Sequence, residues 1–262
     1  NKKAEEYYLK AISINSNHWE SKINLTIIYI ESKNFELALK YVNGVLKIKK
    51  DYQPALRDKA LILYNLNDYK KALSLADLSV KQNTKDYIAL NTLALIHIAL
   101  SNLSQARECL LRAIKLNNKY ELSFVNLGRC FELMNLPTDA FKCFLIAEKI
   151  NPHSMLSLNN IGGYYLDQGM YAKALSYFMK AHSIDKSNML VLSNLAKVNF
   201  YLDNYGLAEK YINDCLKLDS SNDDYRKTYA IFLLKQKKYD EAWEYYEGRL
   251  RLSEFSNKNL HA

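Results

Sequence analysis

Alanine recurs with one unvarying period along the whole chain, and this spacing constrains the possible folds more than any other feature of the sequence. The column consists of Ala4, Ala38, Ala72, Ala106, Ala140, Ala174, Ala208 and Ala242, which gives a period of 34. A second column keeps the same register and holds mostly small residues: Thr26, Ala60, Ala94, Gly128, Gly162, Ala196 and Ala230. A period that never slips predicts repeated units that stack on one another, because one such unit cannot bury its apolar face alone.

Each unit has the pattern of two amphipathic helices. In the unit that begins at Met155, the first segment has apolar or small residues at helical spacing, namely Leu158, Ile161, Gly162 and Tyr165. The second segment has them at Tyr171, Ala174, Leu175, Phe178 and Ala181. The sequence Gln168-Gly169-Met170 between the two segments predicts a turn. Only 7 Gly and 3 Pro occur in 262 residues, which also favours a chain that is helical nearly throughout.

The pattern resembles the tetratricopeptide repeat family, whose unit is a helix–turn–helix with the same period. The resemblance implies an all-α fold, a right-handed superhelical solenoid. Units are expected to begin near Trp19, Gln53, Tyr87, Glu121, Met155, Met189 and Asp223, so that seven repeats cover residues 19–252. Residues 1–18 are expected to be the second helix of a truncated repeat, and residues 253–262 a tail or the start of a following segment. RNA-binding pentatricopeptide repeats have a period of 35, and the unbroken period of 34 favours the first family.

Motifs that carry chemistry are missing from the sequence. There is no Gly-rich phosphate loop, no H-E-x-x-H and no Cys/His spacing suited to zinc. The cysteines Cys109 and Cys143 are one period apart, at equivalent places on adjacent repeats, which is too far for a disulfide and predicts free thiols. We therefore expect no catalysis within this segment, no cofactor and no metal.

Charge and hydropathy limit the partners. The formal charge of +8 comes from dispersed basic residues, which does not favour a nucleic acid as the partner. No stretch approaches the length of a membrane-spanning helix, and no secretory signal is present. We expect a cytoplasmic protein, although the chain does not begin with Met and a targeting segment could lie upstream.

In the tetratricopeptide family the first helices line the concave face, so the resemblance assigns the ligand surface to them. The sixth residue of each unit is Asn24, Asp58, Thr92, Asn126, Asn160, Asn194 or Thr228. The consecutive residues Asn126, Asn160 and Asn194 form a candidate ladder, similar to that of the repeat region of O-linked N-acetylglucosamine transferases. A carboxamide offers a donor and an acceptor, which suits a peptide backbone. The alternative is that these asparagines bond within the solenoid.

Other side chains are expected on the same face. Arg129 and Lys197 would add positive charge, and Leu166 and Tyr201 would add apolar surface. The column Leu122, Leu156 and Leu190 fits either ligand pockets or packing between repeats, and packing is the favoured interpretation. The expected ligand is an extended, partly apolar peptide or protein segment.

The last repeat adds a further likeness. Residues 239–250, from Tyr239 to Leu250, are similar to the closing repeat of bacterial proteins whose repeats continue into a transferase domain, often a glycosyltransferase. The predicted function is a protein-binding scaffold, the recruiting arm of a larger protein of that kind. The alternative is a stand-alone assembly factor or chaperone for a secretion or pilus complex. Uncapped end repeats would also allow self-association.

Overall fold

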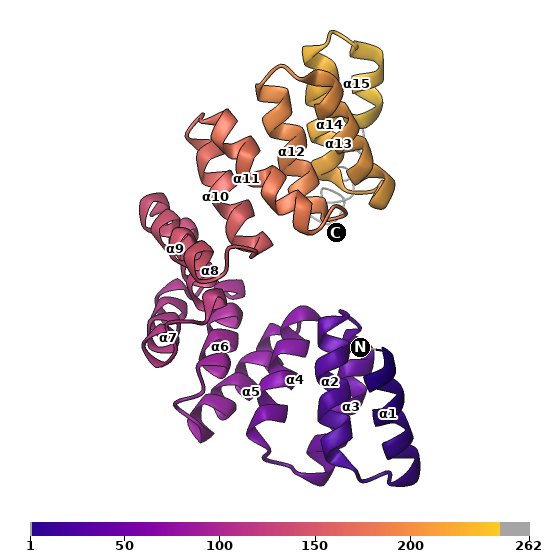
Figure 1. The fold of residues 1–262 in the computed structure, drawn as a ribbon, viewed down its shortest axis with the longest axis vertical. Helices are drawn as coiled ribbons and strands as arrows, with labels where there is room; N and C mark the ends of the chain where they lie inside the picture. Colours follow the sequence, from indigo (N-terminus) through magenta and orange to yellow (C-terminus); the bar gives the residue numbers. More distant parts are fainter. Residues whose placement is uncertain (1, 247–262) are drawn as a thin grey trace, which may run out of the picture. The chain divides into compact units, whose positions relative to one another are not determined.

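The computed structural model describes residues 2–246, which form fifteen α-helices and no strands (Figure 1). The helices are α1 (Lys2–Ile14), α2 (Trp19–Glu31), α3 (Phe35–Ile48), α4 (Gln53–Asn65), α5 (Tyr69–Gln82), α6 (Tyr87–Ala99), α7 (Leu103–Leu116), α8 (Glu121–Leu133), α9 (Pro137–Ile150), α10 (Met155–Asp167), α11 (Tyr171–Ile184), α12 (Met189–Tyr201), α13 (Tyr205–Leu218), α14 (Asp223–Lys235) and α15 (Tyr239–Tyr246). The predicted all-α fold of paired helices is confirmed. The predicted tail, residues 253–262, lies outside the described residues.

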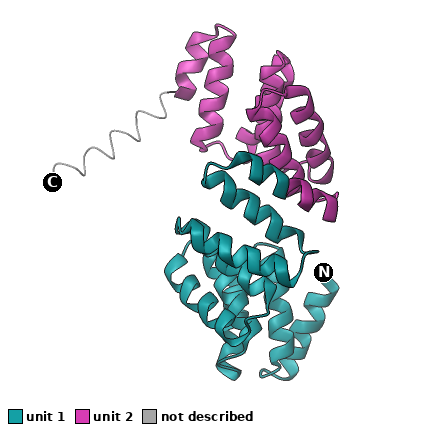
Figure 2. Ribbon diagram, turned by 90° about the vertical axis from the view of Figure 1, so that its left-hand side faces the viewer, with its two compact units in different colours: residues 1–143 teal, residues 144–262 magenta. Residues whose placement is uncertain are grey.

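The chain divides into two compact units, Asn1–Cys143 and Phe144–Ala262 (Figure 2). In the first unit, α2 pairs with α3, α4 with α5 and α6 with α7, and the first helices α2, α4, α6 and α8 contact one another in succession. In the second unit, α10 pairs with α11, α12 with α13 and α14 with α15, and α10, α12 and α14 again contact in succession. Each unit thus presents a row of neighbouring first helices.

The turn inside each pair has one residue in the left-handed region of backbone conformation. These residues are Lys33, Asn67, Ser101, Asn135, Gly169, Asp203 and Lys237, with φ between 58° and 70°. They recur with the same period as the alanine column, and only Gly169 is the residue that adopts this conformation without steric cost. The turn geometry is therefore kept even where the sequence does not favour it.

The alanine column is buried in the described helices after α1. From Ala38 to Ala242 none of its members is more than 1% exposed. Gly162 of the first helix α10 lies at a close contact, since a Cβ atom at this position would lie 2.6 Å from the ring of Phe178 on α11. Phe178 is itself fully buried. The small-residue columns of the sequence therefore mark contacts between helices, as their spacing predicts.

No helix among residues 2–246 is both long enough and apolar enough to cross a membrane.

Candidate ligand-binding surface on the first helices

The predicted site residues belong to both compact units. Asn24, Asn126 and Arg129 lie in the first unit, on α2 and α8. Asn160, Leu166, Asn194, Lys197 and Tyr201 lie in the second, on α10 and α12. Four of the latter, Leu166, Asn194, Lys197 and Tyr201, line one open cavity of about 610 Å³. The second unit therefore brings together half of the residues that the sequence singles out.

This cavity, which we call the polar recess, is built from two successive first helices and the start of α11. Gly163 and Asp167 of α10, Gly169 of the turn and Tyr171 of α11 complete its lining. The rings of Tyr171 and Tyr201 stack with centroids 4.9 Å apart and planes 5° from parallel. Tyr201 is 53% exposed, so this contact holds an accessible ring in one orientation.

A smaller cavity of about 130 Å³ lies between α12 and α14, and we call it the apolar slot. Its lining is Lys197, Phe200, Tyr201, Thr228, Ile231 and Phe232. Phe200 and the buried Phe232 stack with centroids 4.4 Å apart. Lys197 and Tyr201 line both cavities and therefore separate the polar recess from the apolar slot.

Two asparagines of the candidate ladder are bonded to the preceding first helix of their own unit. The Nδ2 of Asn126 donates to the Oδ1 of Asn91 at 3.0 Å, and the Nδ2 of Asn194 donates to the Oδ1 of Asn159 at 2.9 Å. Asn126, Asn91 and Asn159 are buried, whereas Asn194 is half-buried and lines the polar recess. These bonds are the kind that the alternative interpretation of the asparagine column predicts.

The remaining positions of the column are not equivalent to these two. Thr92 and Thr228 each donate from Oγ1 to a carbonyl four residues earlier in the same helix. Asp58 accepts from Arg57. Asn24 and Asn160 are half-buried, and neither side chain has a hydrogen-bond partner among the described residues. The column is therefore chemically mixed, and the candidate ladder of Asn126, Asn160 and Asn194 stays a prediction.

Asn194 and Asn160 provide a matched test of the two interpretations. Replacing Asn194 by alanine removes the donor to the buried Oδ1 of Asn159, so we expect the free energy of unfolding to fall by about 1–3 kcal/mol. Replacing Asn160 by alanine is expected to change it by no more than about 0.5 kcal/mol. Urea denaturation followed by circular dichroism measures both. Equal losses in the two variants would show that the inter-helix bond contributes nothing.

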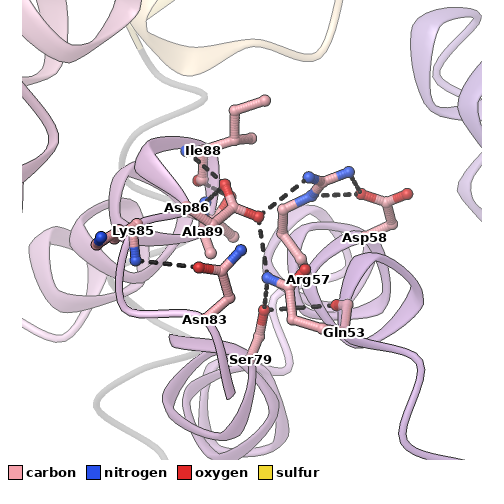
Figure 3. Close-up of polar contacts among 10 residues, drawn as sticks. Gln53, Arg57, Asp58, Ser79, Asn83, Lys85, Asp86, Ile88 and Ala89 are labelled. Atoms are coloured by element: carbon pink, nitrogen blue, oxygen red, sulfur yellow. Dashed lines mark hydrogen bonds and ion pairs between the residues drawn. The ribbon is translucent and has the colours of Figure 1, made fainter. Parts of the chain in front are cut away.

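In the first unit, a charged network occupies the first helices and was not anticipated from the sequence (Figure 3). Arg57 donates from Nε to the Oδ1 of Asp58 at 2.9 Å and from Nη1 to the Oδ2 of Asp86 at 3.3 Å. Gln53 donates to the same oxygen of Asp86 and to the hydroxyl of Ser79. The charged side chains are only 19%, 8% and 11% exposed for Arg57, Asp58 and Asp86.

Burial and pairing act in opposite directions on the two carboxyl groups. Burial raises the pKa of Asp58 above its usual value, despite the adjacent Arg57. Burial would also raise the pKa of Asp86, but the hydrogen bonds from Gln53 and the backbone of α6, together with the charge of Arg57, lower it. Asp86 also caps α6, because its Oδ1 accepts from the N–H groups of Ile88 and Ala89. The guanidinium of Arg57 on α4 therefore connects this helix to the start of the next first helix, α6.

The leucine column is more open than the favoured packing interpretation predicts. Leu156 and Leu190 are 41% and 53% exposed, so packing between repeats accounts for only about half of their surface. Leu122 is half-buried, and the nearby Arg129 is exposed. Apolar surface on the first helices of the second unit is therefore available to a ligand.

Reactive groups on the described residues are few. All four cysteines are buried free thiols, as predicted, and burial raises the pKa of Cys109, Cys143 and Cys215 to about 11. A thiol with so high a pKa is a poor nucleophile at neutral pH. Within residues 2–246 no group of His, Cys, Asp and Glu side chains is placed to hold a metal ion.

Comparison with protein families identifies repeats in three segments. Residues 87–120, 157–188 and 191–222 match the family described as tetratricopeptide repeat. Together they make up less than half of the chain. A comparison with curated protein sequences gives no match.

The fold is similar to that of several solved structures. PilF from Pseudomonas aeruginosa has a TM-score of 0.65 at 18% identity, over 81% of this chain and 96% of PilF. PilW, described as a widely conserved type IV pilus biogenesis factor, has a TM-score of 0.67 at 18% identity, over 76% of this chain and 92% of PilW. A chain of the APC/C hetero-tetramer Cut9–Hcn1 has a TM-score of 0.77 at 16% identity, over 87% of this chain and 45% of that chain. At these identities the likeness shows the fold alone.

Proposed function

We propose that this chain, which carries tetratricopeptide repeats, is a scaffold that binds an extended segment of a partner protein along its first helices. The observation that carries the proposal is the polar recess, where Leu166, Asn194, Lys197 and Tyr201 converge from two successive first helices. Accessible apolar, cationic and amide groups lie there side by side. Apolar and aromatic groups around a cavity, with a few polar groups placed among them, are typical of a binding site.

The chemistry of the recess suits the backbone of a peptide. The Nδ2 of Asn194 is bonded to Asn159, and this fixes the amide while its Oδ1 has no partner among the described residues. That oxygen can accept a hydrogen bond from the backbone N–H of a ligand. One such bond contributes only about 0.5–1.5 kcal/mol, so contacts with side chains such as Tyr201 must provide most of the affinity.

The scaffold is proposed to be the recruiting arm of a larger protein, with a glycosyltransferase as the first candidate for the remainder. This part of the proposal is supported by the sequence of residues 239–250 only. Residues 247–250 of that segment lie outside the described residues. The proposal assigns binding, and no reaction, to the segment itself.

A stand-alone assembly factor is the second candidate function. It is favoured by the likeness to PilF and PilW, since the matched region covers 96% and 92% of those two proteins. A fold of this kind can therefore extend over nearly the whole of a solved chain. The full reading frame distinguishes the two candidates, because a downstream transferase domain supports the first.

Site-directed photo-crosslinking tests where a partner binds. A photoreactive phenylalanine analogue replaces Tyr201 on the first helix α12, and in the matched control it replaces Leu207 on the second helix α13. Both positions are similarly exposed, at 53% and 48%. We expect irradiation in cell lysate to give a defined protein adduct from position 201, which mass spectrometry then identifies, and none from position 207.

Two outcomes of the same experiment would contradict the proposed function. Adducts that form equally from both positions, or only from Leu207, would show that the first helices do not carry the binding surface. Repeating the capture at a second salt concentration addresses the least favoured function, because a nucleic-acid binder would lose its target steeply with salt. A protein adduct that survives the higher salt concentration supports a mainly apolar contact.

A further inference from the structure

The apolar slot between α12 and α14 has a composition that points to a specific ligand chemistry. Four of its six lining residues are apolar or aromatic, and Lys197 is the only charged one. Tyr201 and Ile231 are each 53% exposed beside the stacked rings of Phe200 and Phe232. Such exposed aromatic and aliphatic groups in fixed positions are typical of anchor sites for a single side chain.

The size of the slot favours a side chain over a whole small molecule. Sites for small molecules usually enclose about 300–1,000 Å³, whereas the slot encloses about 130 Å³. The stacking of Tyr201 on Tyr171 and of Phe200 on Phe232 holds both aromatic walls before a ligand arrives. A preformed slot loses little side-chain entropy on binding, which increases the affinity that one anchor can give.

Lys197 gives the slot a positive charge. It lines the slot and the recess, and none of the ion pairs or hydrogen bonds among the described residues involves its ammonium group. The hydroxyl of Thr228 carries no charge, and it donates to the backbone carbonyl of Asp224 in α14. Asp167, the acidic residue of the recess lining, is not part of the slot. A carboxylate therefore complements the slot, and a second ammonium does not.

From this composition we infer that the second unit recognises a partner segment in which a bulky apolar side chain stands next to an acidic one. The apolar side chain enters the slot between α12 and α14, and the carboxylate pairs with Lys197. The inference rests on the proposed function and adds to it the class of sequence that the partner must contain. It also explains why a half-buried lysine is flanked by exposed apolar groups on an otherwise mixed surface.

Short labelled peptides in a Gly/Ser background test the inference by fluorescence anisotropy. The central pair is Asp-Phe in the probe, and Asn-Phe, Asp-Ala and Lys-Phe in three controls. We expect the Asn-Phe peptide to bind about fivefold more weakly than Asp-Phe, the range of a partly exposed ion pair. The Asp-Ala peptide should bind at least about tenfold more weakly, since it loses the anchor.

Variants of the protein separate charge recognition from folding. Lys197→Glu is expected to reverse the order of the peptides, so that Lys-Phe binds better than Asp-Phe. Lys197→Met keeps the aliphatic stem and should bind Asp-Phe and Asn-Phe equally. Ile231→Asp should no longer bind the Asp-Phe peptide, while circular dichroism should show an unchanged helical content. Reversal by charge exchange is a result that a merely structural lysine would not give.

Three outcomes overturn the inference. The first is equal or absent binding of all four peptides to the wild-type protein. The second is an unchanged preference in Lys197→Glu. The third is a concentration-dependent dimer in analytical ultracentrifugation that Ile231→Asp abolishes, because the slot is then occupied by a second copy of the chain. If the photo-crosslink from position 201 is nevertheless obtained, the proposed scaffold function stands and only the ligand class is wrong.

Discussion

At neutral pH, replacing Arg57 by leucine is expected to lower the free energy of unfolding by about 3–5 kcal/mol, the usual cost of removing one partner from a buried ion pair. The guanidinium pairs with Asp58 and Asp86, whose side chains are 8% and 11% exposed. Without it, two buried carboxylates remain close together with no countercharge. The Oδ2 of Asp58 already lacks a partner among the described residues, so it has no ready substitute.

The effect of the Arg57→Leu substitution should depend on pH. Asp86 has a lowered pKa, so its contribution to wild-type stability is present above its unfolded pKa and is lost as the pH falls through the folded pKa. Asp58 has a raised pKa, so its unfavourable contribution at neutral pH is relieved as the pH falls. In the variant both pKa values should be higher, and protonation restores stability. The difference in the free energy of unfolding between the variant and the wild type should therefore become smaller as the pH falls from 7 to about 4.

Urea denaturation at both pH values measures this difference, and an exposed pair provides the control. Lys71 pairs with Asp68 at 2.7 Å, closer than either contact of Arg57, but its side chain is 76% exposed. Lys71→Leu should leave stability almost unchanged, because solvent screens exposed pairs. If Arg57→Leu costs no more than Lys71→Leu, or if its cost grows in acid, the network is not the buried charge system described above.

Replacing Phe178 by alanine is expected to lower the free energy of unfolding of the second unit by about 3–5 kcal/mol, since a fully buried ring leaves a cavity behind. Gly162→Ala is expected to cost about 1–3 kcal/mol for the opposite reason, because its Cβ would lie 2.6 Å from that ring. The ring of Phe178 fills the space that a Cβ atom at position 162 would need. The two substitutions should therefore be strongly non-additive.

A double-mutant cycle measures this coupling. With Phe178 already replaced by alanine, the new Cβ at position 162 has room, and the higher helix propensity of alanine makes Gly162→Ala neutral or stabilising by up to about 1 kcal/mol. Gly163→Ala is the matched control, because a Cβ there meets no atom within 4 Å. It should be neutral or slightly stabilising in both backgrounds. Additive effects of the two core substitutions would show that Gly162 is not needed for the approach of α10 to α11.

The features that recur in every repeat could be predicted from the sequence. Small residues such as Gly162 and Ala174 recur in fixed columns because two helices must approach there in every repeat, so their spacing reports the helical pair directly. Packing of this kind depends on residue size alone, and size is visible in the sequence. The all-α fold therefore followed from the period without knowledge of any individual contact.

The polar contacts could not be predicted in the same way, because they join residues whose partners differ from repeat to repeat. Asn126 and Asn194 bond to residues 35 positions earlier, Asn91 and Asn159, while the equivalent partner of Asn160 would be Val125. Arg57 occupies the position of Asn91 in its own repeat and reaches Asp86 instead. Side-chain length and the residue at the next helix start decide these pairings, and neither follows a period. The same holds for the apolar slot, which needs the particular residues Phe200, Ile231 and Phe232 together.

The left-handed turns make the repeat an exchangeable part. Residues 170–203 run from the residue after one such turn, Gly169, to the next left-handed residue, Asp203. Deleting them would join Gly169 to Asn204, and the new junction would have the same backbone conformation as the old one. Gain or loss of a whole repeat therefore leaves every other helix start and the alanine column in place, whereas an insertion of any other length would shift them. Relatives of this chain should accordingly differ in length by whole repeats, with the cut points at the turns.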